Sequence, residues 1–413
     1  MNIGFVGLGK LGLPCALAVD DKGHKVFGYD IDPNVEHILE TKKLPYKEEG
    51  AQELLDNHDI TFTSLENVIN NSEIIFVPIQ TPHNEKYEGI TRIPEDRVDF
   101  DYTWLKSGLK AISEEVDKIG EDRTVVIIST VLPGTVRREI KPLLSDHIKL
   151  CYNPFFIAMG TTIRDFLHPE FVLFGVDDQS AYKKASSFYS TLHSRPVYKC
   201  TIEEAEMIKV TYNTYITMKI CMANAVMEIA HKLENIDCDK VMEGLFLANE
   251  RLISPRYLYG GMGDGGGCHP RDNIALSWLA QKLDLSYDWY ENLMMCREKQ
   301  TDWLADLMED WNLPKVILGK AFKPETNLTV GSPAVLLKNI LEERGHVVEM
   351  YDPHLDKVKP EFEKSVFLIG CKHNDFIEYE FPEGSVVLDP HRYINKDSAG
   401  KNVTVIHIGK QND

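Results

Sequence analysis

The chain opens with the stretch Asn2-Ile3-Gly4-Phe5-Val6-Gly7-Leu8-Gly9-Lys10-Leu11-Gly12, in which a short apolar run leads directly into a GxGxxG pattern. The run predicts a β-strand at Asn2–Val6, and a helix is expected over Leu11–Lys22. In such a turn the first glycine permits a tight bend, the second lets a pyrophosphate approach the backbone, and the third lets helix and strand pack closely. We therefore expect a dinucleotide to bind at Gly7, Gly9, Lys10, Leu11 and Gly12.

An acidic residue after the second predicted strand, Lys25–Tyr29, selects between two cofactors. Asp30 follows this strand, 18 residues after Gly12. A carboxylate at this point accepts hydrogen bonds from the ribose hydroxyls of adenosine and repels a 2′-phosphate. The two motifs together predict NAD rather than NADP, whereas the simpler interpretation of Gly7–Gly12 is a structural glycine turn.

Beyond this start, the pattern predicts three regions. Apolar Ile/Val/Phe runs first alternate with helical stretches, which is typical of parallel strands covered on both faces. A helix without glycine or proline is then expected over Ile202–His231, about 45 Å long, and helical sequence continues to about Trp311. The α/β alternation returns from Lys315, with a helix over Ser332–Arg344. Further strands are expected at Ile60–Thr63, Glu73–Pro78, Thr124–Ser129, Lys149–Tyr152, Val316–Gly319, Val347–Tyr351, Ser365–Ile369, Ser385–Leu388 and Val403–Ile408.

Composition excludes several classes of partner. A chain of 413 residues predicts two or three domains. Its net charge of −19 argues against nucleic acid or an anionic membrane as partner. We find no apolar run long enough to span a bilayer and no signal peptide after Met1. The eight cysteines show no CxxC spacing, which fits free thiols in a reducing cytoplasm, and we expect no metal.

Four polar residues before the glycine-rich loop are candidates for chemistry. Thr81 and Thr130 follow predicted strands, whose carboxyl ends face the cofactor crevice of a doubly wound sheet. Lys209 and Asn213 lie four residues apart on the long helix and hence share a face. An ammonium and an amide that converge would stabilise a developing alkoxide. The alternatives are threonines that bond locally in turns, and a solvated lysine with an incidental asparagine.

A thiol at the end of a glycine-rich loop, Gly260–Gly267, is the clearest candidate nucleophile. Cys268 stands four residues before Asp272. Glycines let backbone amides approach a phosphate or sugar closely, the thiol can attack a carbonyl, and the carboxylate can manage protons or water. The alternative is an inert buried cysteine beside a glycine loop.

Taken in order, these motifs resemble those of the UDP-glucose/GDP-mannose dehydrogenase family over essentially the whole chain. The matching segments are GLGKLGLP, YDID, Glu48-Glu49-Gly50, VPIQTP, STVLPGT, Tyr152-Asn153-Pro154 with Gly160, Asp165 and His168-Pro169, Ala205–Lys209 with Asn213, GGGCHPRD, Leu318–Pro324 with Thr326 and Ser332-Pro333, and Tyr351-Asp352-Pro353. The resemblance implies an NAD-binding Rossmann domain (1–200), a central helix and dimerisation domain with the nucleophile loop (201–311), and a C-terminal Rossmann-like nucleotide-sugar domain (312–413). The expected fold is therefore α/β, with two doubly wound domains joined by the long central helix and a helical dimerisation region.

The family also implies an activity: four-electron oxidation of a sugar CH2OH to a carboxylate with two NAD, as from UDP-glucose to UDP-glucuronate in a cytoplasmic homodimer that serves polysaccharide biosynthesis. Lys209 and Asn213 would stabilise the alkoxide, and Thr130 and Asp272 would position a water. Cys268 would form a thiohemiacetal and then a thioester. Thr81 and Thr130 would also contact the cofactor. The residues expected to bind the substrate are Asn153, Phe155, Lys209, Asn213, Arg251, Tyr257, Gly265 and Lys323.

Several positions depart from the family pattern. The family usually has Asn-Pro-Glu where this chain has Asn153-Pro154-Phe155, and Met159 fills another position that is often acidic. Phenylalanine cannot activate water, so thioester hydrolysis is expected to be slow or to depend on Asp272 and bound water. Other departures are Asp264, Arg271 and, where an arginine is usual, Val330. Because these changes cluster around substrate binding, a different nucleotide sugar, such as a UDP-N-acetylhexosamine, stays open.

Two other hypotheses about function compete with the four-electron oxidation. A two-electron β-hydroxyacid dehydrogenase shares the NAD fingerprint and the Lys-xxx-Asn helix, needs no cysteine loop and forms one NADH per substrate. An enzyme of the same family that stops at the aldehyde would also form one NADH per substrate. A non-catalytic nucleotide-sugar or NAD sensor would need none of the candidate catalytic residues.

Overall fold

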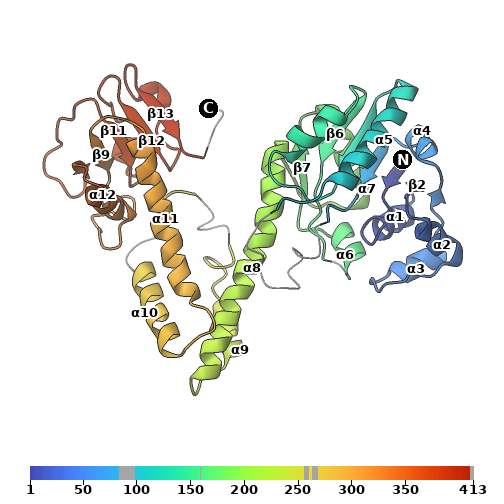
Figure 1. Ribbon diagram of the computed structural model, residues 1–413, viewed down its shortest axis with the longest axis horizontal. Helices are drawn as coiled ribbons and strands as arrows, with labels where there is room; N and C mark the ends of the chain where they lie inside the picture. Colours follow the sequence, from blue (N-terminus) through green and yellow to red (C-terminus); the bar gives the residue numbers. More distant parts are fainter. Residues whose placement is uncertain (83–97, 159, 255–259, 263–267, 410–413) are drawn as a thin grey trace. The chain divides into compact units, whose positions relative to one another are not determined.

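The computed structural model contains two compact units, Met1–Met218 and Lys219–Asp413, whose boundary falls inside helix α8 (Ile202–Lys232) (Figure 1). It describes residues 1–82, 98–158, 160–254, 260–262 and 268–409. Inside α8 and α10 (Cys268–Lys282), a further set is described by its backbone alone: Thr217, Ile220, Cys221, Ala223, Asn224, Ala225, Glu228, His231, Cys268, His269, Arg271, Asp272, Ala275 and Leu276. The division at 200 and 311 stays a prediction.

The first unit is built on an eight-stranded sheet in the order β3-β2-β1-β4-β5-β6-β7-β8. Strands β1 to β6 pair in parallel in the order of a dinucleotide-binding fold, while β7 runs antiparallel to β6. The strands are β1 (Asn2–Val6), β2 (Lys25–Tyr29), β3 (Thr61–Phe62), β4 (Ile74–Val77), β5 (Arg123–Ile127), β6 (Ile148–Tyr152), β7 (Val172–Val176) and β8 (Val197–Cys200). The α-helices of this unit, besides the start of α8, are α1 (Gly12–Asp21), α2 (Pro33–Thr41), α3 (Ala51–Asn57), α4 (Leu65–Asn71), α5 (Thr103–Ile119), α6 (Thr162–Leu167) and α7 (Gln179–Leu192).

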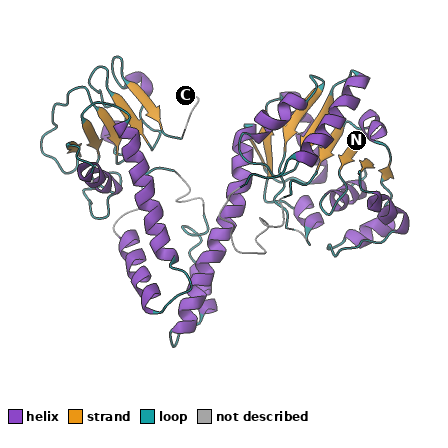
Figure 2. Ribbon diagram, in the orientation of Figure 1, coloured by secondary structure: helices purple, strands orange, loops and turns teal. Residues whose placement is uncertain are grey.

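Both faces of this sheet are covered, as the continuous apolar strands predict (Figure 2). Ile3 and Phe5 of β1 pack with α1, α6 and α7 in one core cluster, while the next residue, Val6, belongs to the second cluster with α4, α5 and α8. Successive strand side chains point to opposite faces, so one strand supplies both clusters. The carboxyl edge of the sheet is left to the loops that carry the candidate site.

The second unit holds a five-stranded parallel sheet in the order β10-β9-β11-β12-β13. Its core forms between this sheet and helices α11 and α12, around Leu304 and Leu337. The strands are β9 (Lys315–Leu318), β10 (Val348–Tyr351), β11 (Val366–Ile369), β12 (Val386–Asp389) and β13 (Thr404–His407). The α-helices, besides the end of α8, are α9 (Cys238–Phe246), α10 (Cys268–Lys282), α11 (Trp289–Glu309) and α12 (Pro333–Glu343).

The strands and helices expected from the sequence are present, with ends that differ by one or two residues. The long helix expected at Ile202–His231 is α8, Ile202–Lys232. The sequence prediction did not include β7 and β8, the two strands that extend the first sheet past β6. Among the described residues, no helix combines the length and apolar character needed to cross a membrane.

Candidate active site

The glycine turn after β1 has the geometry that a dinucleotide requires. Gly7 takes a φ of +110°, and a Cβ on Gly12 would lie 2.1 Å from the Gly7 carbonyl oxygen. No atom lies within 4 Å of where a Cβ on Gly9 would stand, so that side of the turn is open to a ligand. Asp30 accepts a hydrogen bond from the Leu8 amide at 2.5 Å and lines an open pocket at the end of β2. The predicted NAD residues therefore fit the pyrophosphate and ribose of the cofactor.

Two neighbouring crevice loops, after β4 and β5, are joined through the predicted threonines. The Thr81 hydroxyl donates to the Thr130 carbonyl oxygen at 2.8 Å. Ser129 donates to the Ile79 carbonyl oxygen and reinforces the same connection. The two predicted cofactor threonines thus belong to one connected edge of the sheet, and both are half-buried.

Lys209 is the most unusual charged residue of the first unit. The residue is 8% exposed, and its ammonium lies 5.3 Å from the centre of the Phe156 ring. Within the described part of the chain, no carboxylate lies within ion-pairing distance of it. Burial lowers the pKa of the Lys209 ammonium because desolvation disfavours the charged form. An unpaired buried cation over an aromatic ring is costly to maintain, which favours a functional role.

A residue that the sequence analysis missed, Glu206, ties the Lys209 helix to the loop after β5. Its buried carboxylate accepts hydrogen bonds from the Gly134 amide at 2.5 Å and the Val136 amide at 2.8 Å. Burial raises its pKa, although the two amides act in the opposite direction. Glu206 and Lys209 lie three residues apart on one helix, and this spacing is the feature of the sequence that could have identified Glu206.

The loop after β6 carries two of the residues predicted to bind the substrate, Asn153 and Phe155. Asn153 is 1% exposed; its amide donates to the Leu173 carbonyl oxygen at 2.8 Å and accepts from the Tyr189 hydroxyl at 2.5 Å. Its side chain joins β6 to β7 and α7. Phe155 packs on Phe166 with ring centres 5.3 Å apart, and the pocket beside them, about 20 Å³, holds about one water and no sugar.

Glu48 holds this loop from more than a hundred residues away. Its carboxylate accepts from the Gly160 amide at 2.9 Å and from the Thr162 amide at 2.6 Å, at the start of α6. Asp165 closes the same turn by accepting from the Ala158 amide at 3.0 Å. The acidic-glycine motif and the substrate-loop motif found in the sequence thus form one structural unit.

In the second unit, Cys268 is the first residue of α10, four residues before Asp272 on the same helix. The side chains of both, together with Tyr257 and Gly265, lie outside the described residues. The start of the glycine loop is held at two carbonyl oxygens: Arg392 donates to that of Gly260 at 2.5 Å, and Gln300 to that of Gly261 at 3.1 Å.

The remaining predicted substrate residues are accessible to solvent. Arg251, Asn213 and Lys323 are exposed, and Val330, which stands where the family has an arginine, is 78% exposed. The substrate-binding role of these residues stays a prediction, as it does for the buried Asn153 and the partly buried Phe155.

Three features together define an NAD-dependent dehydrogenase. They are the glycine turn after β1, the acidic residue after β2 and the buried lysine on α8. Comparison with known families adds the particular group. The chain belongs to the UDP-glucose/GDP-mannose dehydrogenase family, since the family's NAD binding domain matches residues 1–193 and its central domain matches residues 203–298. NAD is thus the cofactor, and nucleotide-sugar 6-dehydrogenation is the activity of the family.

Individual relatives span most of the chain. GDP-mannose 6-dehydrogenase of Pseudomonas aeruginosa is 28% identical over 402 residues, covering 94% of this chain and 87% of the relative. UDP-glucose 6-dehydrogenase TuaD of Bacillus subtilis is 28% identical over 366 residues, covering 85% and 76%. Among solved structures, a ternary complex of GDP-mannose dehydrogenase from Pseudomonas aeruginosa superposes with a TM-score of 0.85 at 25% identity, covering 98% of this chain and 99% of that one.

Proposed function

We propose that this protein oxidises the C6 hydroxymethyl group of a nucleotide-activated hexose to a carboxylate, using two NAD per turnover. The observation that carries the proposal is the buried Lys209 ammonium, which has no counter-ion among the described residues and is tied through Glu206 to the cofactor-side loop. Such a cation stabilises an alkoxide more strongly than an exposed one, because it acts in a medium of low dielectric constant.

In the first half of the reaction, Lys209 and Asn213 stabilise the alkoxide that forms as the C6 hydroxyl loses its proton. Thr130 and Asp272 position the water that accepts this proton. Bound NAD supplies the hydride acceptor for each of the two oxidations. The product of this half-reaction is the C6 aldehyde.

In the second half, the Cys268 thiolate adds to the aldehyde carbon and forms a thiohemiacetal. Loss of the C6 hydride turns this adduct into a thioester, and attack by water releases the carboxylate and the thiol. Asp272 assists this water, since Phe155 packs on Phe166 and has no group that can accept a proton. Intact-mass measurement during turnover should therefore detect an acyl adduct on Cys268; rapid release of acid with no adduct would contradict a slow hydrolysis step.

We assign substrate binding to Arg251, Tyr257, Gly265 and Lys323. The protein acts as a homodimer, as the family implies. For the sugar nucleotide, relatives that act on GDP-mannose and on UDP-glucose are equally similar in sequence, at 28% identity. The solved GDP-mannose dehydrogenase superposes along nearly the whole chain, which favours GDP-mannose. The UDP-glucose expected from the sequence motifs is the second candidate, because a UDP-glucose 6-dehydrogenase is 28% identical over 366 residues.

A panel of nucleotide sugars with NAD tests the proposal. GDP-mannose, UDP-glucose and two UDP-N-acetylhexosamines are each scored for NADH formed per sugar consumed and for product mass. Two NADH with a carboxylate product support the proposal and identify the sugar. One NADH indicates a two-electron enzyme, with the product mass separating an aldehyde from a keto acid. Binding without NADH indicates a sensor.

A further inference from the structure

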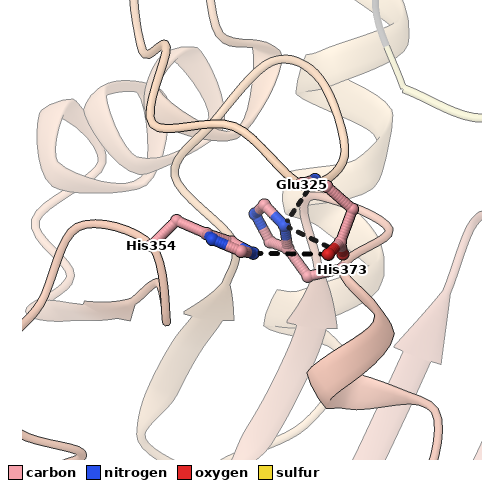
Figure 3. Close-up of side chains that lie close together, drawn as sticks. All are labelled: Glu325, His354 and His373. Atoms are coloured by element: carbon pink, nitrogen blue, oxygen red, sulfur yellow. Dashed lines mark hydrogen bonds and ion pairs between the residues drawn. The ribbon is translucent and has the colours of Figure 1, made fainter.

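Two histidines and a glutamate converge in the second unit: Glu325, His354 and His373. Figure 3 shows His354 and His373 both directed at the Glu325 carboxylate. His354 Nε2 lies 3.8 Å from Glu325 Oε2, and His373 Nδ1 lies 3.8 Å from Glu325 Oε1. One ligand atom from each residue lies within 4.8 Å of the other two. These separations exceed direct side-chain hydrogen bonds but suit donor atoms around a shared ion.

The hydrogen bonds of His373 fix the tautomer that a metal needs. The ring is completely buried, and its Nε2 lies 3.1 Å from Asp352 Oδ2. Asp352 also accepts from the Lys320 and Ala321 amides, so it is an ionised acceptor and His373 Nε2 carries the proton. His373 Nδ1 is therefore a lone-pair donor, as its acceptance of the Glu325 amide at 3.0 Å requires. A carboxylate behind a histidine in this way is the usual support of a metal-binding imidazole.

Glu325 is held in a strained conformation that turns it toward the histidines. Its φ of +58° is left-handed, a region that non-glycine residues rarely adopt. Oε1 accepts from the Asn374 amide at 2.8 Å, which orients the carboxylate and leaves its other lone pairs available. The side chains of Glu325 and His354 are 45% and 32% exposed, so an ion can reach them from solvent.

The cluster occupies the position in this sheet where ligands bind. Glu325 follows β9, His354 follows β10 and His373 follows β11, so all three lie beyond the carboxyl ends of adjacent strands. The chain order reverses at β9, whose two neighbours are β10 and β11. Crevices at such a reversal are the common ligand sites of open α/β sheets.

We propose that His354 Nε2, His373 Nδ1 and a Glu325 carboxylate oxygen bind a divalent transition-metal ion of the zinc class, with water as the remaining ligand. Two imidazoles and one carboxylate are a donor set that Zn²⁺ accepts. Ligand atoms around Zn²⁺ stand about 3.3 Å apart, so the three ligand atoms, which lie within 4.8 Å of one another, close by up to about 1.5 Å. The ion also takes the place of the hydrogen bond that the Glu325 amide donates to His373 Nδ1. The ion cross-links the three loops after β9, β10 and β11. This inference does not depend on the proposed function.

Zinc titration of the full-length protein tests it. After treatment with a chelator, wild type is titrated with Zn²⁺ by calorimetry and its melting temperature is followed with and without the ion. A double variant, Glu325→Gln with His354→Gln, removes two ligands from solvent-accessible positions. His346→Gln is the matched control, since His346 bonds directly to Glu309 at 2.7 Å in the same unit without forming a cluster. Cys238→Ser controls for zinc at the Asp237-Cys238-Asp239 group.

The site predicts one zinc per chain in wild type and both controls, with a rise in melting temperature on binding. The double variant should bind Zn²⁺ more weakly than wild type by more than roughly 10–100-fold, since loss of a residue that only supports a metal ligand already costs that much. Its melting temperature should not rise when zinc is added. Wild type that takes up no zinc, or a double variant that binds it as wild type does, overturns the proposal. If the double variant melts abnormally without metal, Glu325→Gln alone decides the same question, because glutamine has nearly the same shape and the side chain is 45% exposed.

Discussion

The Lys209 ammonium lies over the ring of Phe156, 5.3 Å from its centre, on a residue that is 8% exposed. Phe156 also packs on Tyr212, with ring centres 4.5 Å apart, so one aromatic ring joins two residues of α8 to the loop after β6. Its neighbour Phe155 packs on Phe166 in the opposite cluster. The residue that replaces the family's glutamate thus packs against one core cluster, and the next residue lies beneath the Lys209 ammonium.

Replacement of Lys209 by methionine should change activity and stability in opposite directions. Loss of the cation should lower kcat by roughly 10²–10³-fold, the usual effect of removing one oxyanion donor. The melting temperature should rise, because an unpaired buried charge is replaced by a side chain of similar length. Steady-state kinetics and thermal unfolding of the same preparation check both. A variant that loses activity and also melts earlier would assign Lys209 a structural role.

The pH profile of the first hydride transfer should reflect the lowered pKa of Lys209. The rate requires the ammonium, so it should decline as pH rises through a value below the ordinary lysine pKa of 10.5. In the window between the folded and unfolded pKa values, the unfolded state binds more protons, so stability from this group should rise with pH there. Lys209→Arg should move the alkaline decline to higher pH, since guanidinium stays charged. An unchanged decline would exclude Lys209 as its source.

Glu206→Gln should damage the site without touching a ligand. The carboxylate accepts from two backbone amides, and a glutamine offers only one oxygen, so one buried donor loses its partner at a cost of about 1–3 kcal/mol. We expect a lower melting temperature and a lower kcat with KM for NAD nearly unchanged. Glu203→Gln is the control on the same helix, because Glu203 pairs with Arg137 at the surface. Equal effects of the two substitutions would contradict the connection through Glu206.

Asp30→Asn should weaken NAD binding and relax cofactor choice. The carboxylate is expected to accept charge-assisted bonds from the adenosine ribose, worth about 1.5–3 kcal/mol, so KM for NAD should rise by roughly 10–100-fold. Discrimination against NADP should fall, because the charge that repels its 2′-phosphate is gone. The ratio of kcat/KM for the two cofactors measures this. Asp59→Asn, at an exposed ion pair with Lys42, should leave the ratio unchanged, and an unchanged ratio in Asp30→Asn would refute the assignment.

Arg392→Met should slow the thiol-dependent step. Arg392 and Gln300 hold the two carbonyl oxygens at the start of the nucleophile loop, and small displacements of a nucleophile cost up to about 100-fold. Aldehyde should therefore accumulate and react with an added hydroxylamine trap. Arg344→Met, at a surface cluster with Asp306 and Glu309, is the matched control. If Arg392→Met instead slows the first oxidation and no aldehyde is trapped, Arg392 does not act on the thiol-dependent step.

Local signals in the sequence predicted most of the fold. The run at Asn2–Val6 and the glycine turn after it depend on neighbours in sequence, so β1, α1 and the role of Asp30 could be inferred. Strand β7 was missed although Val172–Val176 is an apolar run, because its antiparallel pairing with β6 departs from the βαβ pattern.

Roles that depend on distant contacts could not be predicted. Asn153 bonds to Leu173 and Tyr189, and its motif in the sequence gives no sign of these contacts. Glu48 reaches Thr162, 114 positions later. The cluster of Glu325, His354 and His373 joins residues that follow three different strands, and no spacing in the sequence indicates that they meet.

The central claim, a four-electron oxidation through a covalent thioester on Cys268, is tested most directly by NADH yield with and without the thiol. Wild type, given limiting sugar nucleotide and excess NAD, should form two NADH per sugar and the carboxylate. Cys268→Ala should form no carboxylate and at most one NADH per sugar, with the aldehyde captured by a trap. Two NADH and carboxylate from Cys268→Ala, or a single NADH from wild type with every sugar nucleotide that it oxidises, would contradict the account.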